Sequence, residues 1–239
     1  MERFARVVVG VLITAALLVA ADRATVFVAA RFVARELTDV QHLARPATVT
    51  FRGFPFLTQV GAGRYQDVEA SLSGVPTVGP LIVDQLDARL HGVRAPIAAA
   101  LRGELTQVSV EQGEARGFVS FVSMERAANE LLGVRGATVT LTRAAPDRVA
   151  FNARVTSILG AVTVRGQISV SVQREAVVLR LLPETLFGVP PALRAQIVPQ
   201  MDLTHLAPSL PFGFRATEAI VDSSGIRLQA TGRGLIIPV

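Results

Sequence analysis

Apolar and polar residues alternate through most of the chain after residue 46. Val68, Ala70 and Leu72, for example, are separated by acidic and hydroxyl side chains. The same period of two is found at residues 48–52, 67–73, 85–91, 107–111, 148–156, 167–173 and 226–231. An apolar face opposite a polar face is typical of an antiparallel sheet with one solvated side. The short gaps between these segments predict hairpins and not βαβ crossovers.

Three segments carry helical signals instead. In residues 23–38, apolar side chains recur at helical spacing while Arg31 and Arg35 lie on another face. A second helix is predicted from Ser123, as its N-cap, to Gly133, and a third from Pro190 to Pro199. So few helices cannot cover both faces of so many strands. The sequence therefore predicts an α+β fold in which a long, curved antiparallel sheet wraps around a helix.

The alternation changes parity at Gly53. Val49 and Phe51 are the apolar positions before this glycine, and Phe54 and Phe56 are those after it. A glycine at such a switch predicts a bulge or bend that turns the apolar side of the strand. Pro55 predicts an edge strand or a local break in pairing.

The N-terminus resembles a targeting segment. Arg3 and Arg6 precede an apolar stretch at residues 7–21, which is followed by Asp22 and Arg23. As a helix this stretch reaches about 22 Å, short of the roughly 30 Å hydrocarbon core of a bilayer. We therefore expect residues 1–21 to be either a cleaved signal peptide or a short signal-anchor, and residues 22–239 to form a single domain. Both interpretations predict export to a periplasm-like space or to the outer face of the cytoplasmic membrane.

Composition narrows the class of protein. The chain has 239 residues, of which 50% are hydrophobic, and it lacks cysteine and tryptophan. This apolar richness excludes a disordered chain, and the missing cysteine excludes a disulfide scaffold, a zinc finger and a thiol enzyme. The 24 basic residues are all arginines and are dispersed along the chain. Because a nucleic-acid-binding protein concentrates its basic charge, we expect no nucleic-acid partner.

A search for catalytic chemistry is mostly negative. The three histidines, His42, His91 and His205, show no metal-ligand spacing. No nucleophile elbow, phosphate-binding loop or complete dinucleotide-binding motif is present. Asp84 and Asp87 project to opposite faces of a strand and do not indicate an acid–base pair. We therefore expect a protein without catalytic residues, bound metal or cofactor.

The apolar positions suggest what the interior holds. They are mostly valine, alanine and leucine, and aromatic residues make up only 5% of the chain. A groove lined by small aliphatic groups has room for an acyl chain, which gains about 0.8 kcal/mol for each methylene moved from water. A close-packed core explains the same residues without any ligand. Composition leaves these two alternatives open.

Two segments are distinctive. The first is Arg52-Gly-Phe-Pro-Phe-Leu-Thr-Gln59, followed by Ala62-Gly-Arg-Tyr65. The second is Leu210-Pro-Phe-Gly-Phe-Arg-Ala-Thr-Glu218, followed by Gly225-Ile-Arg-Leu228. With the N-terminal segment, they resemble the DUF2993 family, which includes the LmeA-like phospholipid-binding proteins of actinobacterial cell envelopes. The likeness extends over roughly residues 23–238.

This resemblance implies a tubular lipid-binding (TULIP-like) fold, in which a curved sheet wraps a long helix and encloses an apolar tunnel. It implies a phospholipid or glycolipid partner at a membrane surface. It also implies a supporting role in lipomannan and lipoarabinomannan assembly, with an envelope glycosyltransferase as a partner. The family signature has no assigned chemical role, and no ligand residue is transferred from it.

Our candidate lipid-binding residues come from the apolar pattern. They are Phe54, Phe56 and Leu57 at the mouth of a groove, and Phe118, Phe121 and Leu131 in its wall. The leading hypothesis is a non-catalytic envelope protein that takes acyl chains into this groove. The alternative is a membrane-anchored structural or interaction module with a packed core, which recruits an envelope enzyme.

Overall fold

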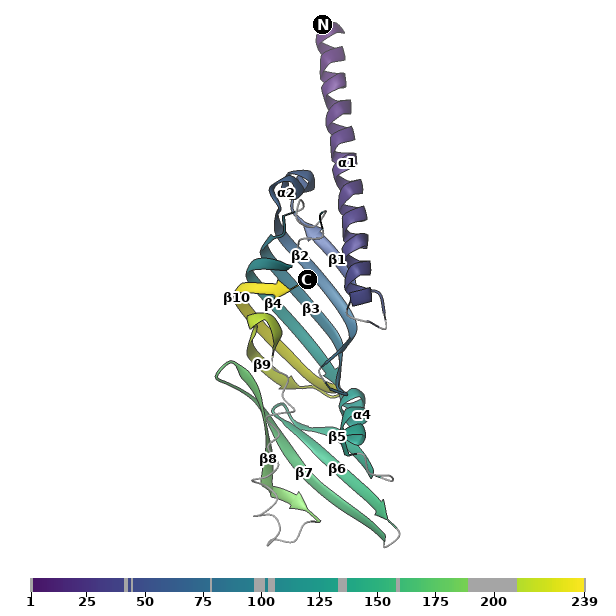
Figure 1. Ribbon diagram of the computed structural model, residues 1–239, viewed down its shortest axis with the longest axis vertical. Coiled ribbons are helices and arrows are strands. Elements are labelled where there is room, and N and C mark those ends of the chain that lie inside the picture. The colour runs from purple at the N-terminus through teal and green to yellow at the C-terminus, as the bar shows by residue number, and fades with distance from the viewer. Residues whose placement is uncertain are drawn as a thin grey trace.

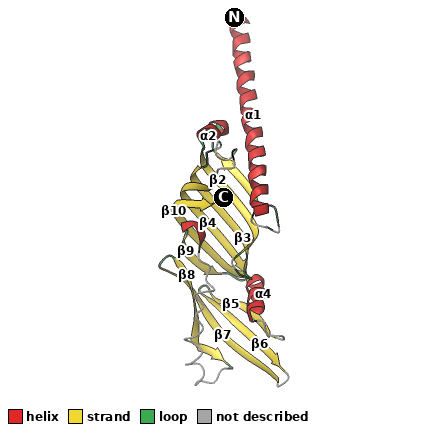
Figure 2. Cartoon of the chain, viewed as in Figure 1, coloured by secondary structure: helices red, strands yellow, loops and turns green. Residues whose placement is uncertain are grey.

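Two antiparallel sheets lie end to end in an elongated molecule, and a long helix extends beyond one end (Figure 1). This architecture comes from a computed structural model, which describes residues 2–40, 43, 45–77, 79–96, 102, 106–132, 137–157, 160–188 and 210–238. Strands make up most of the described chain, as the yellow ribbons of Figure 2 show. The fold is α+β, as predicted, and its sheets are not closed into a barrel.

Helix α1 (Glu2–Val40) is continuous across the expected boundary between residues 21 and 22. Its N-terminal half stands clear of the sheets, and its C-terminal part runs beside β1 (Figure 1). The segment Leu12–Asp39 is long and apolar enough to cross a membrane, because it contains an 18-residue window with a mean hydropathy of 1.8, of which 6% is buried. The predicted helix at residues 23–38 is thus the C-terminal half of a longer one.

The larger sheet has six strands in the order β1-β2-β3-β4-β10-β9, each antiparallel to its neighbours. All the alternating segments predicted between residues 48 and 111, and the one at 226–231, belong to it. Their bounds are β1 (Thr48–Arg52), β2 (Arg64–Pro76), β3 (Ile82–Arg94), β4 (Gln107–Ser120), β9 (Arg215–Val221) and β10 (Gly225–Pro238). Strand β9 was not predicted.

The smaller sheet has four strands in the order β5-β6-β7-β8, paired as successive hairpins. Its two central strands contain the alternating segments predicted at residues 148–156 and 167–173, and its two outer strands were not predicted. The bounds are β5 (Ala137–Ala145), β6 (Arg148–Ser157), β7 (Gly160–Gln173) and β8 (Ala176–Phe187).

The six-stranded sheet bends where two glycines face the same residue. Gly92 of β3 and Gly234 of β10 both lie opposite Glu111 of β4, and both have positive φ, 63° and 59°. Glycine adopts this conformation without the steric cost of a Cβ. Beyond the bend the apolar parity changes, so that Val93 and Leu235 become core residues. The apolar side of the sheet therefore stays continuous across the bend.

The segment after Gly53 is a helix and not a strand. Gly53 has φ 101°, and helix α2 (Phe56–Ala62) begins directly after Pro55 and ends at Gly63, which has a left-handed conformation. The expectation that Phe54 and Phe56 continue the strand with reversed parity is therefore wrong. The break expected at Pro55 is present, and it leads into a helical turn at the end of the sheet (Figure 1).

Helix α4 (Phe121–Leu132) starts two residues before the predicted N-cap. The Ser120 hydroxyl accepts the Ser123 backbone N–H at 3.2 Å, so Ser120 has the capping role that was assigned to Ser123. The Asp84 carboxylate of β3 accepts the Ser120 N–H at 2.7 Å and the Ser123 hydroxyl at 2.8 Å. Asp84 thereby holds the start of α4 at the junction of the two sheets. The helix predicted at Pro190–Pro199 lies outside the described residues.

Buried apolar side chains form clusters at both ends of the six-stranded sheet. The cluster at the α1 end contains Val49, Val68, Val93, Val110 and Leu235. The cluster at the junction joins the two sheets through Phe121, Val149, Val170, Val177, Ala216, Val221 and Ile226. Backbone bonds strengthen this junction, among them the Val221 N–H to the Pro146 carbonyl at 2.7 Å. A third cluster contains Leu43, Ala47 and Leu72. The core of the described chain is therefore divided among three clusters, of which two lie at the ends of the sheet.

The junction predicts a specific acid sensitivity. Burial alone would raise the pKa of Asp84, but hydrogen bonds from Ser120 and Ser123 outweigh it, and the net pKa lies below the usual value of about 3.8. A carboxyl group with a lowered pKa stabilises the fold above its unfolded-state pKa, and this contribution is lost as the pH falls through the folded-state value. We expect the wild type to lose stability below about pH 3.8, and Asp84→Asn to lack this part of the dependence.

Urea denaturation at a series of pH values measures the effect. Asp87→Asn is the matched control, because Asp87 is on the same strand and bonds Ser71 and Gln85 on the polar side. Identical pH profiles for wild type and Asp84→Asn would contradict the assignment.

Candidate functional site

A row of alanines crosses the apolar face of the six-stranded sheet, which is the face that carries Val68, Ala70 and Leu72. In five neighbouring strands, an alanine is paired in register with an alanine of the next strand. The row consists of Ala70, Ala88, Ala115, Ala230 and Ala216. With neighbouring strands about 4.8 Å apart, it extends over roughly 19 Å.

The rows on either side carry several longer side chains. One contains Val68 and Leu90, and the other contains Leu72, Leu86, Gly117 and Leu228. The methyl groups of the alanine row therefore project less far from the sheet than several neighbouring side chains. This middle part of the face lies between the clusters at the two ends of the sheet. The third cluster packs against it at Ala70 and Leu86.

The middle of the apolar face is only partly covered. Within the alanine row, Ala70, Ala88 and Ala115 are half-buried, whereas Ala216 and Ala230 are buried. Leu86 and Leu228 of the adjoining row are also half-buried. A Cβ built on Gly117 would have no atom of the described structure within 4 Å. By contrast, a Cβ on Gly113 would meet Leu235 at 2.7 Å. Free space therefore lies over the sheet at Gly117, next to the alanine row.

The opposite face of the same sheet is polar and carries ion pairs. Glu69 contacts Arg52 at 2.8 Å and Arg89 at 3.6 Å, and His91 pairs with Asp67. The arginines are exposed, and the acidic side chains and His91 are half-buried, on the outer side of the sheet. The described histidine is thus part of a surface ion-pair network, whereas His42 and His205 lie outside the described residues. No group of three or more metal-binding side chains occurs in the described chain.

The structure separates the three candidates for the groove mouth. Phe56 is 1% exposed and packs against Phe51 and Tyr65, with ring centroids 5.4 and 6.0 Å away. Phe54 and Leu57 are 57% and 44% exposed. One motif thus supplies a core residue and two surface apolar residues at the tip of the sheet.

The three wall candidates are not brought together either. Phe121 is buried in the cluster at the junction of the sheets. Phe118 faces the opposite side of β4 from Gly117, because neighbouring residues of a strand alternate between faces. Leu131, near the end of α4, is 59% exposed. Of these, only Phe121 borders the partly covered face, because Leu228 packs against its cluster.

A buried carboxylate connects α1 to α2. Asp22 is 2% exposed, and its Oδ1 accepts the backbone N–H of Leu57 at 2.9 Å. The other oxygen accepts a hydrogen bond from the Arg23 guanidinium at 3.1 Å. Arg23 in turn lies over the ring of Phe54, 5.2 Å from its centroid. The link fixes the height of α2 along α1.

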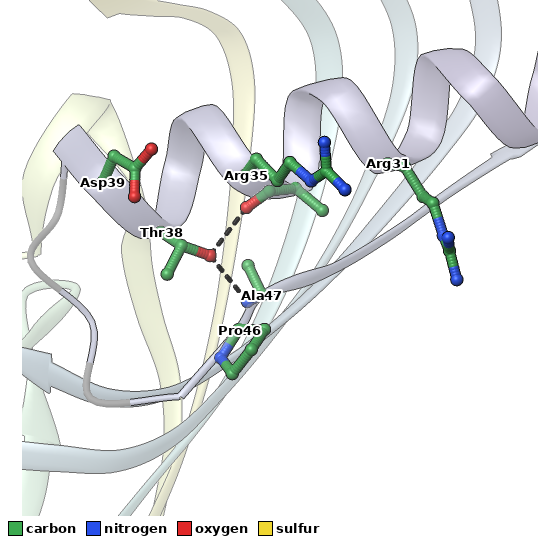
Figure 3. Close-up of a pocket in the computed structure, with 7 residues that line it drawn as sticks. Arg31, Arg35, Thr38, Asp39, Pro46 and Ala47 are labelled. Carbon is green, nitrogen blue, oxygen red and sulfur yellow. Dashed lines mark hydrogen bonds between the residues drawn. The ribbon is translucent and has the colours of Figure 1, made fainter.

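An open cleft of about 420 Å³ lies between the C-terminal part of α1 and the segment before β1 (Figure 3). The Thr38 hydroxyl joins its two sides, because it donates to the Ala34 carbonyl at 2.7 Å and accepts the Ala47 N–H at 2.9 Å. Arg31 and Arg35 contribute two exposed guanidinium groups to its lining. Asp39 adds one carboxylate to the lining, so the cleft carries two positive charges and one negative charge beside α1. A second open cleft, of about 630 Å³ on the four-stranded sheet, has a mixed lining that includes Thr140, Asn152 and Gln167.

Sequence analysis did not find the alanine row. Several of its members were recognised as inward-facing positions, but their alignment depends on the register of three pairs of successive strands and on the return of β10 beside β4. The single usable signal was the recurrence of alanine or glycine near the middle of the alternating segments.

Comparison with known proteins gives one match. A family model described as LmeA-like phospholipid-binding matches residues 20–231, nearly the whole chain. No curated protein and no solved structure gives a significant match.

The different burial of Phe54 and Phe56 leads to a testable difference in stability. We expect Phe56→Ala to lower the free energy of unfolding by about 3–5 kcal/mol, because it removes a buried ring from an aromatic cluster. Phe54→Ala should change it by no more than about 0.5 kcal/mol, as is usual for a surface position. Urea denaturation of the full chain in detergent, followed by circular dichroism, measures both. Equal losses for the two variants would contradict this assignment.

Proposed function

This chain belongs to the LmeA-like phospholipid-binding family, and from that membership we propose that it is a non-catalytic cell-envelope protein that holds phospholipid acyl chains against the alanine row. The observation that carries the proposal is the free space at Gly117, beside half-buried Ala88 and Ala115. A sheet face that is apolar but incompletely covered favours an apolar ligand.

The energetics support a hydrocarbon chain as the occupant. The row extends over roughly 19 Å, and each methylene removed from water contributes about 0.8 kcal/mol. A lipid tail along the half-buried stretch from Ala70 to Ala115, about 10 Å or roughly eight methylenes, would gain on the order of 6 kcal/mol before the cost of ordering it. Methyl groups and glycine leave space for the tail, whereas leucine or phenylalanine at these positions would occupy that space.

The candidate residues have different places in this proposal. Phe121 closes the end of the apolar face at the junction of the sheets. Phe54, Phe56 and Leu57 lie at the other end, beside α1, where a lipid would enter from a membrane. Phe118 and Leu131 lie farther from the proposed path of the tail.

We further propose that α1 holds the protein at the outer face of the cytoplasmic membrane. Its apolar composition and its exposure support this location. A role in lipomannan and lipoarabinomannan assembly, with an envelope glycosyltransferase as partner, is carried by the family resemblance alone. The alternative is an interaction module whose core is complete without a lipid.

Filling the space at Gly117 tests the proposal. Gly117→Leu should displace about two methylenes of a bound tail, which at ~0.8 kcal/mol each lowers phospholipid affinity on the order of tenfold. The measurement is the amount of phospholipid that co-purifies with the full chain from its native envelope, determined by mass spectrometry after extraction. The melting temperature should not fall, because a Cβ at this position meets no described atom.

Gly79→Leu is the matched control, since a Cβ on Gly79 also has no described atom within 4 Å and this glycine lies in the turn after β2, off the apolar face. The control should retain the lipid content of the wild type. A wild-type protein that is always empty, or a Gly117→Leu protein that retains all its lipid, would favour the packed interaction module.

A further inference from the structure

The first apolar run of α1 is too short for a bilayer. Residues 7–21 form about 22 Å of helix, whereas a hydrocarbon core is about 30 Å thick. Beyond Asp22 and Arg23 the helix again exposes large apolar side chains, with Phe27 58% and Val28 66% exposed. If the bilayer reaches Val28, residues 7–28 supply about 33 Å of helix, which is sufficient to span it.

The charged pair that interrupts the apolar run of α1 has partners that suit this position. Asp22 is almost fully buried, and its oxygens accept hydrogen bonds from Leu57 and Arg23. Arg23 lies over the Phe54 ring, and its long side chain can extend toward the head groups. These contacts reduce the cost of placing a carboxylate about 9 Å inside a bilayer edge near Val28.

The link between Asp22 and Leu57 places α2 at the same depth. Asp22 lies about 9 Å along the helix axis from Val28, and the N-terminus of α2 is bonded to it. Phe54 and Leu57 at this tip are large, apolar and exposed. Interfacial protein segments bury their apolar side chains about 5–10 Å into the boundary of the bilayer. The depth set by the helix therefore agrees with the depth at which such side chains are stable.

Charge at the next turn of α1 fits the same position. Arg31 lies one helical turn beyond Val28, with its guanidinium 4.6 Å from the centroid of the Phe27 ring, and Arg35 follows one turn later. Both side chains are exposed. At this height they would face lipid phosphates, which arginine binds well.

We propose that Phe54 and Leu57, at the tip formed by α2 and the residues before it, insert into the outer interface of the bilayer that α1 spans, with the bilayer edge near Val28. The occupant of this apolar surface is thus the membrane itself. The inference rests on the part of the proposed function that places α1 in a bilayer, and it is independent of whether the alanine row binds a lipid tail.

Site-specific fluorescence tests the position of the tip. Because the chain contains no cysteine, single substitutions label it without background. The full chain with Leu17→Cys, Leu57→Cys or Leu131→Cys is labelled with a polarity-sensitive dye. It is then reconstituted into vesicles of phosphatidylcholine and phosphatidylglycerol. These three leucines are all exposed, at 66%, 44% and 59%, and they represent the helix, the tip and the distant helix α4.

Nitroxide-bearing lipids report depth. The label at position 17 should be quenched most by a nitroxide near the end of the acyl chain. The emission of the label at position 57 should shift to the blue. This label should be quenched most by a nitroxide near the head group. The label at position 131 should show neither effect. Phe54→Cys gives a second reading of the tip, and thermal melting confirms that each variant is folded.

Each contrary result overturns the inference in a recognisable way. If position 17 is quenched but positions 54 and 57 remain as polar as position 131, α1 spans the bilayer without the tip, and the tip is free for a protein partner. If position 17 is not quenched, α1 does not span, and the membrane anchor in the proposed function fails with it. Neither result would affect the separate prediction that the Gly117→Leu variant binds less lipid.

Discussion

The register of β2, β3, β4 and β10 decides what the six-stranded sheet offers to its surroundings. Antiparallel pairing places Ala88 opposite Ala115 and Ala115 opposite Ala230. A shift of one residue in any of these strands would bring a polar or charged side chain from the wet face into this row, because successive side chains alternate between faces. The apolar face and the ion pairs around Glu69 thus depend on the same pairing.

Much of the fold could be predicted, because a period of two is recorded locally in the sequence. The strands containing Val68, Leu86 and Ile226 were found from alternation alone. Strands β5, β8 and β9 were missed. The prediction for residues 54–56 was wrong for a different reason. Two phenylalanines at alternating positions resemble a strand, but Gly53 and Pro55 redirect the backbone into a helix.

The candidate site was less predictable than the fold. Large apolar residues attract attention in a sequence, and so Phe54, Phe118 and Leu131 were selected. The apolar face is distinguished by the small residues Gly117 and Ala115. Their place beside other small residues becomes visible only when distant strands are aligned. The link from Asp22 to Leu57 was equally hidden, because its partners are far apart in the chain and one of them is a backbone N–H. This carboxylate, together with the Thr38 hydroxyl that accepts the Ala47 N–H, gives the long helix a defined position relative to the sheet.

The alanine row also bears on selectivity. A line of methyl groups offers no hydrogen bond to a hydrocarbon and no branched shape that must be matched, so it gives little basis for discriminating one chain from another. Recognition of unsaturation or methyl branching would need irregular pockets, and these residues do not form one. A surface of this kind would still accept acyl chains when an organism alters the fatty acids of its membranes with temperature or nutrition.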